Sequence, residues 1–124
     1  MRNSITPLSG GRLRKEYRGT LAWKREITLL RQMAGSGLCP ELLDAPLRQA
    51  EMTECPGVPL GECVRAASRQ EAREMMAALA VWTDAFEREY HRRTGQTAVL
   101  EDLSPGNFLW DAASRKITGL DFEF

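Results

Sequence analysis

The sequence predicts an α+β fold, because two segments have helical periodicity and several short apolar runs are typical of strands. Apolar side chains recur every three or four positions over residues 21–34 and again over residues 70–93. The other apolar runs are short and lie between glycine, proline, asparagine and aspartate residues, which favour turns. The 124 residues are enough for one domain that buries its own core.

The composition narrows the classes of protein to consider. Lys and Arg together number 17, as do Asp and Glu, and this zero net charge argues against a general binder of nucleic acid or anionic membranes. No apolar run approaches the length of about 18 residues that indicates a membrane span. The N-terminus lacks the apolar core of a secretory signal. One histidine and three cysteines without C-x-x-C spacing argue against a zinc site, so we expect reduced thiols in a cytoplasmic protein.

The first third of the chain predicts a strand followed by a helix. Residues 5–11 end in a glycine turn, and residues 12–17 favour a short strand with Leu13 facing inward. Thr20 is the predicted N-cap of a helix over residues 21–34. One face of this helix carries side chains at helical spacing, namely Ala22, Glu26, Leu29, Leu30 and Met33.

Glu26 is the charged residue on this otherwise apolar face. A carboxylate on a buried face is costly unless it is paired. Arg14 and Lys15, in the preceding strand, are the candidate partners. A slip of one residue in the strand register would exchange the two, so both remain open at this point.

The rest of the chain predicts further short strands and two more helices. Residues 47–53 favour one or two strands, a short helix is expected over 60–67, and a long helix over 70–93. Strands are expected at residues 97–100, 108–110 and 116–120. The long helix carries one apolar stripe, formed by Met75, Leu79, Trp82, Phe86 and Tyr90.

Three polar residues in the last quarter of the chain form the candidate catalytic constellation. Asp102 and Asn107 form a D-x-x-x-x-N pattern in a polar loop, and Asp121 follows the last predicted strand. The hairpin over residues 108–120 is expected to bring Asn107 and Asp121 close together. Mg²⁺ prefers oxygen ligands of this kind, and a further carboxylate can orient an acceptor hydroxyl and take its proton. The alternative is that these three are turn and strand-end residues around Pro105.

In the order and spacing of these residues, the chain resembles the protein kinase-like superfamily. The branch that it resembles contains aminoglycoside and choline phosphotransferases and lipopolysaccharide (Kdo-type) kinases. Residues 100–111 are similar to the catalytic loop of that branch, and residues 120–123 are similar to the end of its metal-binding hairpin. The resemblance implies a phosphotransferase that uses ATP and Mg²⁺ and acts on a hydroxyl of a small molecule or a protein. It implies Asp102 as the catalytic base and Asn107 and Asp121 as the magnesium ligands.

Further segments resemble the family in the same order along the chain. The resemblance implies roles at the ATP site for Gly10 and Gly11 in a phosphate-covering loop, Arg14 and Lys15 in the strand that reaches the phosphates, Glu26 in the helix that braces this basic residue, and Glu54 in a hinge whose backbone binds adenine. The alternatives are an ordinary glycine turn and a purely structural ion pair at Glu26.

The chain departs from the family pattern at several places. Leu100 replaces a structural histidine, and Glu101 adds a negative charge beside Asp102. The sheet and its phosphate-covering flap are expected to be much reduced. The sequence ends shortly after Asp121, where the family continues into a substrate-binding lobe.

These departures set the expected organisation and partners. We expect one truncated kinase-like domain over residues 1–124, with an N-lobe-like part at 1–54 and a C-lobe-like part at 55–124. Part of the stripe on the long helix is expected to be exposed and covered by a second copy of the chain or by another protein. The alternative function is a non-catalytic, pseudokinase-like module. The phosphate acceptor is left open, and neither nucleic acid nor a membrane span is expected.

Overall fold

The computed structural model describes residues 3–98, 100 and 104–122 of the chain. These residues form two antiparallel sheets and three α-helices, which confirms the α+β class. The chain divides into two compact units. The first comprises Met1–Glu54 together with Asp121–Phe124, and the second comprises Cys55–Leu120.

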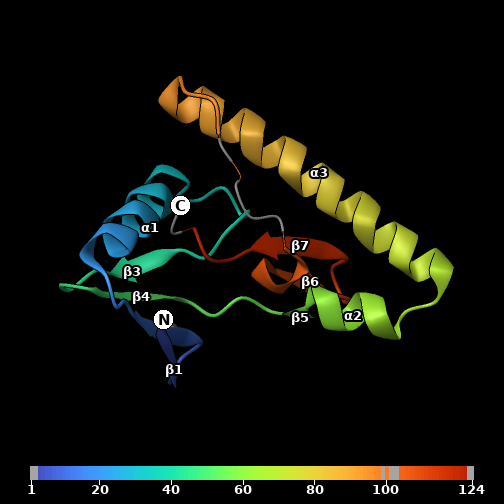
Figure 1. Cartoon of the computed structure of the whole chain (residues 1–124), viewed down its shortest axis with the longest axis horizontal. Coiled ribbons are helices and arrows are strands. Elements are labelled where there is room, and N and C mark those ends of the chain that lie inside the picture. Colours follow the sequence, from blue (N-terminus) through green and yellow to red (C-terminus); the bar gives the residue numbers. More distant parts are fainter. Residues whose placement is uncertain (1–2, 99, 101–103, 123–124) are drawn as a thin grey trace. The chain divides into compact units, whose positions relative to one another are not determined.

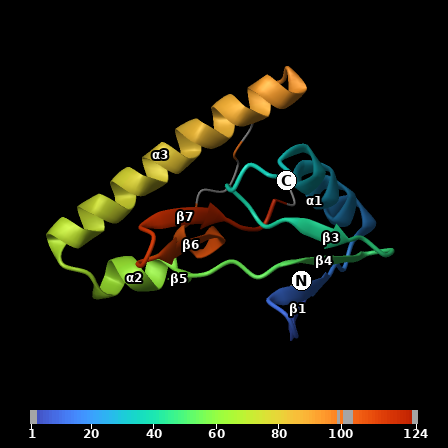
Figure 2. The same cartoon turned by 180° about the vertical axis from the view of Figure 1, so that it is seen from behind.

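The first unit is a four-stranded antiparallel sheet with one helix packed on it. The strand order is β1-β2-β4-β3, and Figure 1 and, from behind, Figure 2 show α1 lying along β3 and β4. Its elements are β1 (Ser4–Leu8), β2 (Arg12–Glu16), α1 (Thr20–Gln32), β3 (Leu42–Asp44) and β4 (Gln49–Thr53). In β4, Ala50 and Met52 are buried and alternate with half-buried neighbours, as expected for a strand with one face on the core.

Strand β1 is an element that the sequence analysis did not predict. It pairs with β2 along its whole length. The turn between them contains Gly10 and Gly11 at φ of 74° and 70°, a left-handed backbone that glycine adopts freely and that costs other residues about 1–2 kcal/mol. The side chains of β1 are exposed except for a half-buried Leu8. No apolar alternation therefore marks this strand, and periodicity could not reveal it.

Helix α1 begins at a different cap from the one predicted. The N-cap is Gly19, whose carbonyl accepts a hydrogen bond from the Trp23 N–H at 3.2 Å, so that Thr20 is the first helical residue rather than the cap. The helix ends at Gln32, and Gly35 follows with a φ of 76°. The buried side chains of α1 and of the residue after it are Glu26, Ile27, Leu30 and Met33.

The second unit is a three-stranded antiparallel sheet with two helices. The strand order is β5-β6-β7, α2 contacts β5 and β6, and α3 contacts β7. Its elements are β5 (Val58–Pro59), α2 (Leu60–Ala66), α3 (Arg69–Thr94), the 3₁₀ turn η1 (Pro105–Asn107), β6 (Phe108–Asp111) and β7 (Lys116–Gly119). These elements confirm the short helix, the long helix and the final hairpin that the sequence predicts.

The predicted strand over residues 97–100 is wrong for the residues that the structure describes. Residues 97, 98 and 100 belong to no strand, and Val99 lies outside the described residues. The sheet of this unit consists of β5, β6 and β7, and residues 97, 98 and 100 are not part of it. A short apolar run becomes a strand only where a neighbour offers backbone hydrogen bonds.

Four of the five residues in the apolar stripe of α3 are buried, and the fifth, Tyr90, is half-buried, so less of the stripe is exposed than expected. Met75, Leu79, Trp82 and Phe86 are at most 8% exposed. The Trp82 ring stacks on Phe86 and meets Phe108 of β6 edge-on, with 5.0 Å between ring centroids in each pair. The exposed apolar side chains of the helix, Met76 and Val81, lie off this stripe. The expectation of a partner that covers the stripe stays a prediction.

Gly57 holds β5 close to β6. Its φ is 126°, and a Cβ at this position would lie 2.7 Å from the carbonyl oxygen of Trp110. Val58 then pairs with Trp110 across the two strands. Only glycine permits this approach of the two backbones.

None of the helices in the described part of the chain combines the length and the apolar character needed to cross a bilayer. The longest, α3, carries charged residues along its length.

Replacing Phe86 by alanine tests the contribution of the buried stripe. Because the Phe86 side chain is 0% exposed, we expect Phe86→Ala to lower the free energy of unfolding by about 3–5 kcal/mol. The matched control is Val81→Ala on the same helix, which is 68% exposed and should change that free energy by less than about 0.5 kcal/mol. Urea unfolding followed by circular dichroism measures both, and equal losses would contradict the assignment of this face to the core.

Candidate functional site

The Glu26 carboxylate is buried in the first unit and accepts three hydrogen bonds. Its Oε1 accepts from the Lys15 Nζ at 2.8 Å and from the Tyr17 hydroxyl at 2.5 Å. Its Oε2 accepts from the Phe122 backbone N–H at 2.5 Å. The side chains of Glu26 and Lys15 are 3% and 8% exposed, so the ion pair between them is largely withdrawn from water. A buried carboxylate is tolerated only with donors of this kind.

The register of β2 decides which basic residue meets Glu26. Lys15 is buried and pairs with Glu26, whereas Arg14 lies on the other face of the strand and donates to Glu51 of β4 at 3.3 Å. Successive side chains of a strand point to opposite faces, so the two cannot both reach α1. Of the two candidates that the sequence left open, Lys15 is therefore the partner of Glu26, and Arg14 is directed elsewhere.

Asp121 completes this cluster from the far end of the chain. Its Oδ1 accepts a hydrogen bond from the Lys15 Nζ at 3.2 Å, and its side chain is 44% exposed. The residue has a φ of 64°, a left-handed conformation that aspartate tolerates better than most residues. The next residue anchors it, because the Phe122 side chain is 3% exposed and its N–H is bound to Glu26. The Asp121 carboxylate therefore stands at the solvent side of a buried ion pair.

The charges in the cluster do not cancel. One ammonium, of Lys15, lies between two carboxylates, of Glu26 and Asp121. The ammonium also lies 5.0 Å from the centroid of the Tyr17 ring, within the range of a cation–π interaction. A lysine held in this way offers a fixed positive charge next to a partly exposed oxygen ligand.

Asn107 lies in the second unit, at the end of η1. Its N–H donates to the Ser104 carbonyl at 2.9 Å, and its carbonyl accepts from the Leu120 N–H at 2.7 Å. The Ser104 hydroxyl accepts from the Gly106 N–H at 3.4 Å, so Ser104 rather than Asn107 supplies the side-chain bond of this turn. The side-chain amide of Asn107 therefore takes no part in the hydrogen bonds of this turn. Asp102, the predicted catalytic base, lies outside the described residues.

The remaining predicted residues belong to the first unit. Gly10 and Gly11 form the exposed turn between β1 and β2, where Arg12 Nε donates to the Ser9 carbonyl at 3.1 Å. Glu54 follows β4, and its N–H donates to the Gly11 carbonyl at 2.9 Å. The structure thus brings the glycine turn and the predicted hinge residue together. Any ligand that used the Glu54 amide would have to displace this hydrogen bond.

The predicted magnesium ligands have the right chemistry for that ion. Asp121 supplies a partly exposed carboxylate and Asn107 supplies an amide oxygen, and hard cations take such oxygen ligands. Among the residues that the structure describes, no group of three or more histidine, cysteine, aspartate or glutamate side chains could hold a metal alone. Asp121 belongs to the first unit and Asn107 to the second.

Two members of the cluster were missed by the sequence analysis. Tyr17 is two residues after Lys15, so a strand that buries Lys15 also turns Tyr17 to the same side. That spacing is a signal that could have identified it. The Phe122 amide gave no such signal, because a backbone donor has no residue type to reveal it.

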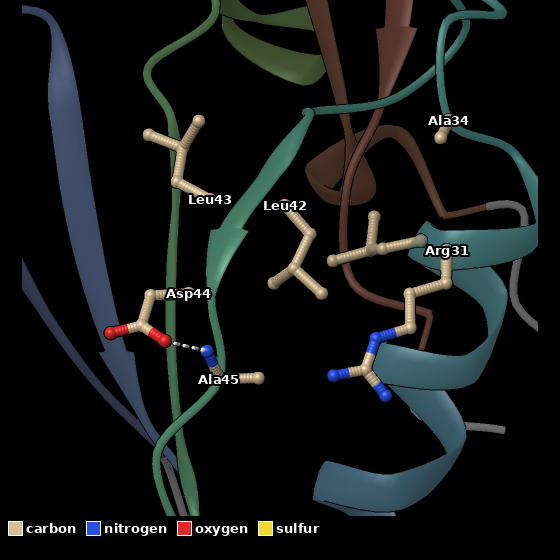
Figure 3. A pocket seen from close by; sticks show the side chains of 7 residues that line it. Arg31, Ala34, Leu42, Leu43, Asp44 and Ala45 are labelled. Atoms are coloured by element: carbon tan, nitrogen blue, oxygen red, sulfur yellow. Dashed lines mark hydrogen bonds between the residues drawn. The ribbon is translucent and has the colours of Figure 1, made fainter.

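Hollows that are lined by described residues also lie outside the cluster, including one in each unit. Figure 3 shows the one between α1 and β3, with a volume of about 320 Å³, where Arg31 and Leu42 point into the space and the Asp44 carboxylate is bound to the Ala45 N–H at 2.9 Å. Its other lining residues are Leu30, Ala34 and Leu43. It contains none of the predicted site residues.

The other hollow, of about 340 Å³, lies in the second unit against Cys63, Met75 and Trp110. At its rim the Arg115 guanidinium donates to Glu74 and, with a further bond from Gln70, holds the pKa of that carboxyl below its ordinary value. This charge pair is exposed, so it contributes little to stability.

Comparisons with known proteins give no indication of function beyond the cluster around Glu26. A scan of protein-family models and a search of curated proteins found no match to this chain.

Removing the Glu26 carboxylate tests whether the buried pair holds the first unit together. We expect Glu26→Ala to lower the free energy of unfolding by about 3–5 kcal/mol, because it leaves a buried ammonium short of a partner. Glu51→Ala is the matched control, since Glu51 also accepts from basic residues of β2 but those residues are about two-fifths exposed, and its cost should be about 1 kcal/mol. Chemical unfolding measures both, and the hypothesis fails if the two variants lose the same free energy.

Proposed function

We propose that this chain is a kinase-like phosphotransferase that uses ATP and Mg²⁺ to phosphorylate a hydroxyl group of a small molecule or a protein. The observation that carries the proposal is the buried ion pair of Lys15 and Glu26, 2.8 Å apart, with Asp121 bound to the same ammonium at 3.2 Å. Phosphoryl transfer depends mainly on positioning and on neutralising negative charge. A lysine that is held in place beside a partly exposed carboxylate suits both the positioning of a phosphate group and the neutralisation of its charge.

The roles of the residues follow from their surroundings. Lys15 is held by Glu26 and would place its ammonium against the phosphates. Asp121, together with Asn107, would hold Mg²⁺, which neutralises the charge that develops on the transferred phosphoryl group. Asp102 is the proposed base that orients the acceptor hydroxyl and takes its proton.

The arrangement of elements supports a reduced kinase-like fold. A small antiparallel sheet with one helix precedes a unit in which two helices lead into a β-hairpin. The proposed metal ligand Asp121 comes two residues after the last strand of that hairpin. Cys39, Cys55 and Cys63 are not joined by disulfides, and the proposed location is the cytoplasm, where ATP is available.

One observation favours the alternative of a non-catalytic, pseudokinase-like module. The Glu26 carboxylate already has three donors from the chain itself, so its burial requires no ligand. A cluster that is satisfied in this way can serve structure alone. Nucleotide binding and turnover separate the two functions.

Thermal unfolding with and without ATP and Mg²⁺ tests nucleotide binding. A ligand that binds only the folded chain should stabilise it by about 2.7 kcal/mol at one hundred times its Kd, and the melting temperature should rise accordingly. Asp121→Asn should remove most of this rise. Asp84→Asn is the control, because Asp84 is an exposed aspartate paired with Arg88 on α3, and it should keep the full rise.

The same proteins then distinguish an enzyme from a binding module. Asp102→Asn should keep the rise in melting temperature and lose ATP turnover, because it removes the proposed base and leaves the proposed nucleotide contacts in place. No rise for the unaltered chain at millimolar nucleotide would rule out both the enzyme and a nucleotide-binding pseudokinase.

A further inference from the structure

Tyr17 is a buried residue that the proposed reaction does not yet use. Its side chain is 4% exposed, and its hydroxyl donates to Glu26 Oε1 at 2.5 Å. Its backbone N–H donates to the Arg48 carbonyl at 2.8 Å, which fixes the chain just after β2. The Tyr17 ring lies under the Lys15 ammonium, 5.0 Å from the centroid.

The hydrogen bonds on Glu26 divide between its two oxygens. Tyr17 and Lys15 share Oε1, and the Phe122 amide takes Oε2. The last torsion of a glutamate side chain is broad, so a carboxylate held at one oxygen can rotate. Donors on both oxygens remove this freedom, and two of them, Tyr17 and Phe122, are neutral groups that do not depend on the ammonium.

Of the three donors to the Glu26 carboxylate, Lys15 is the one that carries a positive charge. An ammonium has three donors, and here they are directed toward Glu26 and toward the more exposed Asp121. We infer that Tyr17 is a positioning residue, which fixes the Glu26 carboxylate so that Lys15 is held in place to meet a phosphate group. This inference rests on the proposed function. The first measurement that tests it requires no nucleotide and does not depend on that function.

The experiment compares the two tyrosines of the chain. Tyr17→Phe removes the hydroxyl and keeps the ring. Tyr90→Phe is the matched control, because the Tyr90 ring stacks on Phe86 in the second unit and its hydroxyl has no hydrogen bond to any described residue. The first readout, without nucleotide, is the NMR signal of the Lys15 ammonium and its rate of hydrogen exchange with water. The second is the affinity for ATP with Mg²⁺ and for adenosine by calorimetry.

Tyr17→Phe should speed exchange of the Lys15 ammonium about tenfold and weaken the binding of ATP with Mg²⁺ about tenfold, which is about 1.4 kcal/mol. The affinity for adenosine, which has no phosphate, should not change. Tyr90→Phe should leave all three quantities as they are. An unchanged Lys15 signal in Tyr17→Phe would overturn the inference, and so would an equal loss of ATP and adenosine binding, which a general loosening of the unit produces.

The proposed function can fail without the inference failing. If the unaltered chain binds no ATP while Tyr17→Phe still speeds the Lys15 exchange, Tyr17 positions Lys15 but the chain is not a kinase. If Tyr17→Phe does not fold, fluorotyrosine incorporated into the Tyr90→Phe background labels Tyr17 alone. The fluorinated phenol is a stronger donor of nearly the same shape, so it should slow the Lys15 exchange. An exchange rate that does not respond to this change overturns the inference.

Discussion

The first unit of this chain depends on satisfying one buried anion, the Glu26 carboxylate. Removing a carboxylate from water costs several kcal/mol, and only well-placed donors compensate for it. Here the donors come from β2, from the residue just after β2 and from the segment that follows β7. The register of the strand, the rotation of α1 about its axis and the path of the last residues must therefore agree. A shift in any one of them leaves a charge or a donor without its partner.

The same constraint explains why Asp121 and Phe122 belong to the first unit, although the hairpin before them belongs to the second. The Phe122 amide and Glu26 are 96 residues apart in sequence, and closing so long a loop costs entropy that grows only slowly with its length. Burial of the Phe122 ring and a hydrogen bond to a charged oxygen offset that cost. The left-handed backbone of Asp121 is held by the residue after it, so the position of its carboxylate is set by packing rather than by local preference.

The sequence predicted those features that show as a pattern within one element. The burial of Glu26 followed from the spacing of α1, and the two other helices and the final hairpin followed from periodicity and turn residues. Features that depend on pairing between elements were not predictable. The choice between Arg14 and Lys15 needed the register of β2, strand β1 has no apolar alternation, and the run at 97–100 found no neighbouring strand. The roles of Asp102, Asn107 and Asp121 in catalysis stay predictions, and Asp102 lies outside the described residues.

The charges of the cluster bear on what it can bind. Glu26 and Asp121 contribute two negative charges and Lys15 one positive charge, while the guanidinium groups of Arg12 and Arg14 share the single carboxylate of Glu51. Taken by themselves, Glu26, Asp121 and Lys15 carry a net charge of −1, which disfavours a phosphate group placed directly beside them. A divalent cation reverses that balance, because its charge is the largest in such a site. If a nucleotide binds at this cluster, we expect it to bind together with a cation. That expectation comes from the charges of Glu26, Asp121 and Lys15, and it does not depend on whether the chain transfers a phosphate.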